Sequence, residues 1–253
     1  MWFVIGSIVD GGPGACRSAM ALRLRVGHPS IHGFLAAGER WADAVEIALA
    51  AASDRLDDHE EVLDFGCGAG KVLGVLDRRY PDLAVHAVDL HEPSIEWVRR
   101  AYPGAAVQVN GYLPPLDLKT GGFDLIYAWS VFTHLPESVQ LEWLRELRRV
   151  VTAGGTLLVS VNLLRPDGSF ANEQLRDLFS RDDLISVGFS FAETFARDPV
   201  LWHGSTERYG HAAHTPAYIE RVWTEQGFDV VSIVPDAIAG AGGQQDVAVL
   251  RAT

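Results

Sequence analysis

The 253-residue sequence has little cysteine and no long apolar run. With only Cys16 and Cys67, a small disulfide-stapled secreted fold is excluded, and we expect a reducing, cytoplasmic location. No stretch approaches the roughly 20 uninterrupted apolar residues of a membrane helix, which predicts a soluble protein without a membrane partner. The opening run 1–9 is apolar but lacks a basic region, so it fits neither a secretory signal nor an anchor.

Basic residues are also scarce, with 21 lysines and arginines against 33 acids and a formal net charge of −12. Nucleic-acid binding depends on clustered cations that release counterions from phosphates. The one basic cluster, Arg145, Arg148 and Arg149, alternates with leucines as on the solvated face of an amphipathic helix. We therefore expect no nucleic-acid partner.

Length and a hydrophobic content of 48% allow one α/β domain with a cap or at most two small domains, and we expect one domain with an insertion. We expect residues 33–253 to form this domain and residues 165–215 to form its substrate-cap insertion. Residues 1–32 are expected to be an N-terminal extension, disordered in part. Within it, residues 1–19 are interpreted either as a frayed tail or as an upstream extension that contributes nothing to the fold.

Short apolar runs alternate with helix-period segments from Glu61 onward, which indicates βαβ units and a mostly parallel sheet. The predicted strands are 61–65, 84–90, 106–110, 123–130, 155–164, 228–234 and one near 246–250. The predicted helices are 34–53, 71–79, a helix opened by Pro93, a helix opened by Pro136, and 216–226. The helix 34–53 either covers a cofactor cleft with Trp41 or only packs on the sheet.

The segment VLDFGCGAG places Asp64 at a strand end and glycines at 66, 68 and 70 just before a helix. Glycine allows positive φ and lets a ligand lie against the backbone, and a helix N-terminus offers free N–H groups. The dinucleotide pattern G-x-G-x-x-G fails because Lys71 occupies the third glycine position. The P-loop pattern fails because the lysine comes too early and is followed by valine. Both phosphate-binding patterns therefore fail on spacing, and a tight turn without a ligand is the structural alternative to a cofactor site.

The run DFGCGAG resembles the first motif, D-x-G-x-G-x-G, of class I S-adenosylmethionine-dependent methyltransferases. The resemblance implies a Rossmann-like sheet of seven strands with helices on both faces and an antiparallel last strand. It implies S-adenosylmethionine as cofactor and S-adenosylhomocysteine as product. In this family Asp64 would orient the amino group of the cofactor, and the turn Gly66, Cys67, Gly68 and Gly70 would cradle the methionyl moiety.

Three further cofactor contacts follow from the same resemblance. Asp89, at the end of the next strand and nineteen residues after Gly70, would accept both ribose hydroxyls; its alternative role is helix capping before Pro93. Leu90 would pack beside the adenine. After the third strand, Asn110 replaces the acid of many family members, and its amide can still accept from the adenine N6 amine. The residues that follow it, Gly111 and Tyr112, are included in the predicted cofactor site.

The run FDLIYAWSVFTHLPE resembles the fourth motif of the family. Trp129 and Ser130 are predicted cofactor contacts, and the loop from Ser130 to His134 would face the sulfonium. His134 is a candidate base or acceptor-orienting group, with a structural position before the next helix as its alternative. Phe132 in the same loop is a candidate substrate contact.

The run HTPAYIERVW resembles the opening of the late helix in bacterial sugar and natural-product methyltransferases, which makes His214 a second catalytic candidate. The C-terminal GGQQDVAVLR resembles the last strand of that subgroup. Further candidate substrate contacts lie in the cap: Phe191, Trp202, His203 and Tyr209.

The spacing of His203, His211 and His214 invites a metal interpretation, but no regular element fixes all three. Catechol-type metal catalysis would also need acids around the fourth and fifth strands, where the sequence has Asn162. We therefore expect no catalytic metal.

No Asn-Pro-Pro-Tyr or Asp-Pro-Pro-Tyr element follows the fourth strand, which argues against methylation of nucleobase amines. A long, aromatic and acidic insertion favours a small or medium-sized acceptor under a lid, and the resemblance points to biosynthetic small-molecule methylation. Methyl transfer to oxygen and to nitrogen both stay open. So do methylation of a protein or carrier-bound substrate, a non-catalytic cofactor-binding role, and a homodimer.

Overall fold

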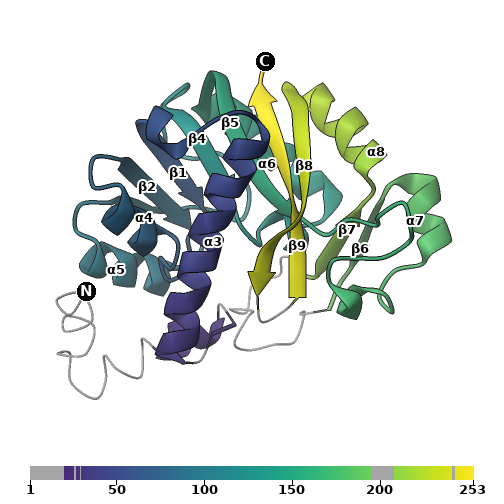
Figure 1. The fold of residues 1–253 in the computed structure, drawn as a ribbon, viewed down its shortest axis with the longest axis horizontal. Coiled ribbons are helices and arrows are strands. Elements are labelled where there is room, and N and C mark those ends of the chain that lie inside the picture. Colours follow the sequence, from purple (N-terminus) through teal and green to yellow (C-terminus); the bar gives the residue numbers. More distant parts are fainter. Residues whose placement is uncertain (1–19, 26, 29, 195–207, 241–242) are drawn as a thin grey trace.

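The computed structural model describes residues 20–25, 27–28, 30–194, 208–240 and 243–253, and its centre is a seven-stranded sheet (Figure 1). The strand order is β3-β2-β1-β4-β5-β9-β8, in which β1 to β5 pair in parallel and β9 runs antiparallel to β5 and β8. The strands are β1 (Glu61–Phe65), β2 (Ala84–Asp89), β3 (Ala106–Val109), β4 (Phe123–Ala128), β5 (Val151–Val161), β8 (Phe228–Gly240) and β9 (Gly243–Ala252). The predicted mostly parallel sheet with an antiparallel last strand is confirmed.

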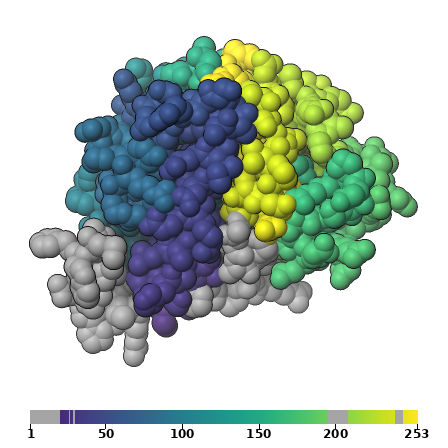
Figure 2. Space-filling view, in the orientation of Figure 1, coloured from purple at the N-terminus to yellow at the C-terminus, as the bar shows by residue number. Residues whose placement is uncertain are grey.

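Helices cover both faces of the sheet (Figure 1). Among the described residues from 31 onward, the helices are α3 (Ile31–Ala51), α4 (Leu73–Arg79), α5 (Glu92–Ala101), α6 (Glu137–Val150), α7 (Arg181–Val187) and α8 (Pro216–Tyr218), which η4 (Ile219–Trp223) and η5 (Thr224–Gln226) continue. Two further single turns are η1 (Leu56–Asp58) and η3 (Glu173–Leu175). Figure 2 shows α3 and the β8–β9 pair side by side on one face of the molecule. No helix in the described part of the chain is long and apolar enough to cross a membrane.

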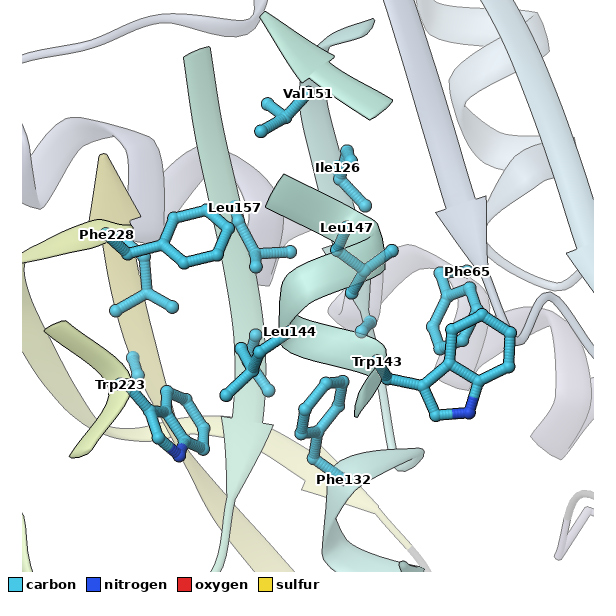
Figure 3. Close-up of a cluster of buried hydrophobic side chains, with 14 of the residues drawn as sticks. Phe65, Ile126, Phe132, Trp143, Leu144, Leu147, Val151, Leu157, Trp223 and Phe228 are labelled. Atoms are coloured by element: carbon cyan, nitrogen blue, oxygen red, sulfur yellow. The ribbon is translucent and has the colours of Figure 1, made fainter. Parts of the chain in front are cut away.

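The apolar core lies in two layers because successive side chains of a strand point to opposite faces. In β1, Val62 packs with α3, α4 and α5, whereas Leu63 and Phe65 pack with α6. The Phe65 and Trp143 rings approach to 4.7 Å between centroids (Figure 3). Each such fully buried side chain contributes about 1.5–3 kcal/mol.

The parallel register brings the carboxyl ends of the central strands to one edge. Asp64 lies opposite Ala87 of β2 and Tyr127 of β4, and Asp89 lies opposite Val109 of β3. The loops after β1, β2, β3 and β4 therefore meet at this edge, where ligands of open α/β sheets bind.

Residues 165–215, the predicted cap, contain α7 and a second sheet of two strands, β6 (Phe189–Ala192) and β7 (His211–His214). A small apolar cluster holds this part together: Leu164, Phe170, Leu175, Phe179, Leu184 and Ala213. A bridge between Leu163 and His214 attaches β7 to the end of β5. The cap is thus more regular than its aperiodic sequence indicates.

Several predicted element ends differ from the structure, and the largest shift is in β8, which was expected to end at residue 234 and runs to Gly240. The fifth strand was expected from residue 155 but begins at Val151. The pairing of β5 with β4 shifts in register between these positions, and Gly154 at φ +76° allows the strand to continue through the irregularity. The late helix covers the predicted residues but changes to π-type over Ile219–Trp223. Residues 20–25, inside the predicted extension, are helical, and Leu22 packs against Phe34 and Ala69.

Candidate functional site

The glycine turn after β1 is shaped by three residues with positive φ. Gly66, Gly68 and Gly70 have φ values of +85°, +54° and +74°. A Cβ on Gly66 would also collide with Val131. The backbone N–H groups of Gly66 and Cys67 donate to the Val88 carbonyl at 2.8 and 3.0 Å, which ties the turn to β2. Side chains at these glycine positions would strain or fill the cradle, as the motif predicts.

Asp64 is buried at the base of this turn, at 3% exposure, and its Oδ2 has no hydrogen-bond partner among the described residues. The pKa of Asp64 is raised to about 7, mainly because burial disfavours the carboxylate. The Tyr127 hydroxyl and Lys71 act in the opposite direction, and Asp89 adds to the rise. A buried, partnerless carboxylate oxygen of this kind suits a cationic ligand.

Lys71 is a charged residue of this site that the sequence analysis did not select. Its Nζ lies 3.0 Å from the centroid of the Trp41 ring, so α3 supplies a cation–π partner beside the turn. Burial lowers the pKa of Lys71 to about 7, although Asp64 favours its charged form. The predicted cover formed by Trp41 is also linked to the loop after β4, since Trp129 Nε1 donates to the Trp41 carbonyl at 3.2 Å.

Asp89 lies directly against the glycine turn. Its Oδ2 accepts from Gly68 N at 2.7 Å and its Oδ1 from His91 N at 2.8 Å. Arg25 Nη2 lies 4.0 Å from the same Oδ1. The structure therefore brings together the two acids that the sequence selected, and it adds Arg25 from the predicted extension, which had no local motif to reveal it.

The loop after β3 holds the second orphaned acceptor. Asn110 donates its backbone N–H to the Asp89 carbonyl at 3.1 Å and its Nδ2 to the Gly111 carbonyl at 2.7 Å. Its Oδ1 is buried and has no partner among the described residues. Leu90, predicted beside an adenine ring, is 46% exposed at the end of β2. An N–H donor of a ligand would satisfy the Asn110 oxygen.

The loop after β4 contains a backbone outlier. Ser130 has φ +56°; its N–H donates to Ser160 Oγ at 2.7 Å and its hydroxyl to Gln245 Oε1 at 3.2 Å. Such left-handed non-glycine residues cluster at functional sites. Trp129 is buried at 5% exposure next to the Tyr127 ring.

Phe132, a predicted substrate contact, is fully buried in the core cluster with Trp143 and Trp223 (Figure 3). Its ring lies 5.7 Å from that of Trp223. This position favours packing over contact with an acceptor.

His134 ends the single helical turn η2 (Phe132–His134) and faces the cap. Its Nδ1 lies 2.8 Å from the Gly210 carbonyl oxygen, and its ring stacks on Tyr209 with centroids 4.8 Å apart. A carbonyl only accepts, so Nδ1 carries the hydrogen and Nε2 carries the lone pair. Burial lowers the pKa of His134 to about 4, with His211 adding to the effect and the Gly210 bond opposing it. The imidazole is therefore neutral near pH 7.

His214, the other catalytic candidate, lies in a different environment. It is fully buried, its Nε2 lies 2.8 Å from Gln140 Oε1, and burial lowers its pKa to about 3. The rings of Phe189, Tyr218 and Trp223 surround it. These contacts favour a role in joining the cap to α6, and catalysis by His214 stays a prediction.

The remaining predicted substrate contacts are divided. Tyr209 contacts His134, while Phe191 lies in β6 under the Arg208 guanidinium, 5.1 Å from its ring centroid. Trp202 and His203 lie outside the described residues. Within the described residues, no group of three or more histidine, cysteine or acidic side chains is arranged to hold a metal ion.

Known proteins similar to this chain include methyltransferases, in agreement with the resemblance found in the sequence. Residues 36–233 match the family model described as a methyltransferase domain. The malonyl-[acyl-carrier protein] O-methyltransferase of Herminiimonas arsenicoxydans is 31% identical over 196 residues, which cover 75% of this chain and 66% of that protein. The trans-aconitate 2-methyltransferase of Rhodopseudomonas palustris is 30% identical over 109 residues, 42% of this chain and 40% of that protein. The chain thus spans less than two thirds of these curated relatives.

A solved S-adenosylmethionine-dependent methyltransferase from Methanosarcina mazei has the same fold. Its TM-score is 0.56 at 19% identity, and the match covers 76% of this chain and 92% of that one. At this identity the likeness concerns the fold alone. Because the family model covers most of the sequence, the chain belongs to the methyltransferase domain family.

Proposed function

We propose that this chain transfers a methyl group from S-adenosylmethionine to an oxygen or nitrogen atom of a small molecule bound between His134 and the cap. The observation that carries the proposal is His134 itself. Its Nδ1–H is committed to the Gly210 carbonyl, so the neutral ring carries its lone pair on Nε2, at the loop after β4. A basic nitrogen at this place suits an acceptor that must lose a proton.

The cofactor side of the proposal depends on residues whose acceptors are unsatisfied. Asp64 would hold the ammonium group of the cofactor and Asn110 the amino group of its adenine, since each offers an orphaned buried oxygen. Asp89 would accept the ribose hydroxyls, in place of or beside its present backbone donors. The positive φ of Gly66 and Gly68 leaves the backbone open to the methionyl part. When bound, S-adenosylmethionine supplies a methyl group activated by its sulfonium.

The protein's own contribution to transfer is alignment, dehydration and proton removal. His134 would accept the proton of a hydroxyl or amine acceptor through Nε2, while the Gly210 carbonyl holds the ring in that tautomer. Stacking on Tyr209 fixes the plane of the ring. With a pKa of about 4, His134 is in the proton-accepting form throughout the neutral pH range.

A carrier-bound acceptor is a second candidate because one relative is named for malonyl-[acyl-carrier protein]. Both curated relatives are named for acceptors that contain carboxyl groups, and a carboxylate needs no base. Dependence of the rate on His134 therefore separates a hydroxyl or amine acceptor from a carboxylate acceptor.

The test is transfer of an isotopically labelled methyl group to a panel of acceptors, read by mass spectrometry. The panel contains small alcohols and phenols, amines, di- and tricarboxylic acids, and a malonyl-loaded acyl carrier protein. With a hydroxyl or amine acceptor, His134→Ala should reduce transfer about 100-fold or more with little change in cofactor affinity. His86→Ala, which removes an imidazole paired with Glu61 far from the loop after β4, is the control. An undiminished rate in His134→Ala would contradict the base assignment, and labelling of carboxylates or the carrier alone would replace the proposed acceptor class.

A further inference from the structure

Side chains from the loops after β3 and β4 bind the segment of the cap that leads into β7. This segment consists of Arg208, Tyr209, Gly210 and His211. We call residues 208–211 the clasp. Tyr112 Oη donates to the Arg208 carbonyl at 2.6 Å. His134 donates through Nδ1 to the Gly210 carbonyl at 2.8 Å, and Gly210 N donates back to the His134 carbonyl at 3.3 Å. The carbonyls of Arg208 and Gly210, the residues before and after Tyr209, are thus bound by side chains from outside the cap.

The other side of the clasp is continuous with the cap. His211 pairs with Ala192 in the β6–β7 ladder, and a Cβ on Gly210 would collide with the Ala192 carbonyl. Arg208 forms an ion pair with Glu193 at 3.1 Å. Movement of the clasp must therefore be accompanied by movement of the two cap strands.

One outside anchor lies in the proposed cofactor loop after β3, and the other is the proposed base in the loop after β4. Tyr112 follows Asn110 by two residues, and its carbonyl accepts from Trp143 Nε1 at 2.9 Å, which fixes this loop on α6. His134 closes the loop that begins at the strained Ser130. The hydroxyl of Tyr209 lies within the electrostatic reach of Asp89 and Arg25. The clasp therefore connects the adenine loop, the ribose acid and the acceptor histidine.

We propose that the clasp couples cofactor binding to assembly of the acceptor site, with Tyr112 as the positioning residue that transmits this coupling. The inference rests on the proposed function. A ligand that satisfies the Asn110 oxygen adds a hydrogen bond to the loop 110–112 and so further stabilises the conformation in which Tyr112 reaches the Arg208 carbonyl. Because linkage is reciprocal, an assembled acceptor site also favours cofactor binding.

The test is hydrogen–deuterium exchange of the full chain with and without S-adenosylhomocysteine, read on the peptide that covers residues 208–214. In the wild type, saturating S-adenosylhomocysteine should slow exchange of this peptide about fivefold, the factor expected of one hydrogen bond. Tyr112→Phe keeps the ring and removes the donor, so the ligand-dependent slowing should fall to less than twofold. Tyr80→Phe, a half-buried tyrosine beside Glu46 on α3, is the matched control and should behave as wild type.

Calorimetry of S-adenosylhomocysteine separates the possible failures. Ligand binding to Tyr112→Phe with wild-type protection of the clasp would overturn the coupling and leave the proposed function intact. Absence of binding to the wild type would overturn both. Steady-state kinetics give a second readout: Tyr112→Phe should raise the acceptor KM more than the cofactor KM, and an equal change in both would overturn the positioning role.

Discussion

Replacing Asp64 with asparagine tests the electrostatics of the glycine turn, because the change removes the charge and nearly preserves the shape. The pKa of Asp64 rises from its ordinary 3.8 to about 7 in the folded protein, mainly through burial. The folded state therefore binds the proton more tightly than the unfolded state, and stability falls as the pH rises from about 4 to about 7. At one pH unit per 1.36 kcal/mol, ionised Asp64 costs up to about 4 kcal/mol above pH 7.

Lys71 changes the pH dependence of stability in the opposite direction, at pH values above 7. Its pKa is lowered from 10.5 to about 7, so the folded protein gains stability as the pH rises above 7. Between pH 5 and pH 7 the buried imidazoles of His28, His134 and His214 change the stability of wild type and Asp64→Asn equally, and Lys71 titrates mainly above this range, so the difference between the two proteins isolates Asp64. Across this range, the unfolding free energy of the wild type should fall by about 2–3 kcal/mol relative to that of Asp64→Asn.

The assay is urea unfolding at pH 5, 6 and 7, followed by calorimetry of S-adenosylhomocysteine at pH 7. Asp64→Asn should gain stability relative to the wild type as the pH rises. Its affinity for S-adenosylhomocysteine should fall about 10- to 100-fold, because the variant lacks one hydrogen bond to a charged group. Asp82→Asn, at an exposed position, is the control and should change neither quantity. Equal pH dependence of wild type and Asp64→Asn would refute the buried-carboxylate argument, and unchanged affinity would remove Asp64 from the ammonium site.

Two further substitutions test neighbouring assignments. Asp89→Ala should lower S-adenosylhomocysteine affinity about 10- to 100-fold in calorimetry while circular dichroism shows the fold intact, and unchanged affinity would remove the ribose assignment. His214→Ala should lower the unfolding free energy by about 3 kcal/mol in urea titrations, because it opens a cavity and leaves Gln140 Oε1 unpaired. Cofactor affinity should be unchanged, and a stable His214→Ala variant that loses only transfer would instead support the catalytic prediction.

The places of the proposed cofactor residues in the fold were predictable because their signals are local. Alternation of apolar runs gave β1 at its observed bounds, Glu61–Phe65. Parallel strands end at one edge, so acids at the ends of β1 and β2 were expected there, and the bond from Gly68 N to Asp89 at 2.7 Å shows that Asp89 lies against the turn that follows Asp64. The resemblance to the methyltransferases then named the ligand from the same residues.

The charged partners of that half were not predictable. Arg25 reaches Asp89 from a segment with no motif, and Lys71 matters because α3 lays Trp41 beneath it. Both contacts depend on tertiary packing, and neither corresponds to a recognisable motif or periodic pattern in the sequence. Packing also explains His214 and Phe132, whose motif positions suggested function and whose side chains are fully buried.

The acceptor half depends on backbone carbonyls, which any residue can offer. The Arg208 and Gly210 carbonyls accept from Tyr112 and His134, so only the two donors are visible in a sequence. A change of side chain at 208 keeps the anchoring carbonyl, while Gly210 must stay small because it packs on Ala192. Acceptor preference can therefore change through the side chains of the clasp and β6 while the cofactor site and its anchors are retained. Substitution of Arg208 should accordingly alter the choice among acceptors in the labelled-methyl panel and leave S-adenosylhomocysteine affinity unchanged.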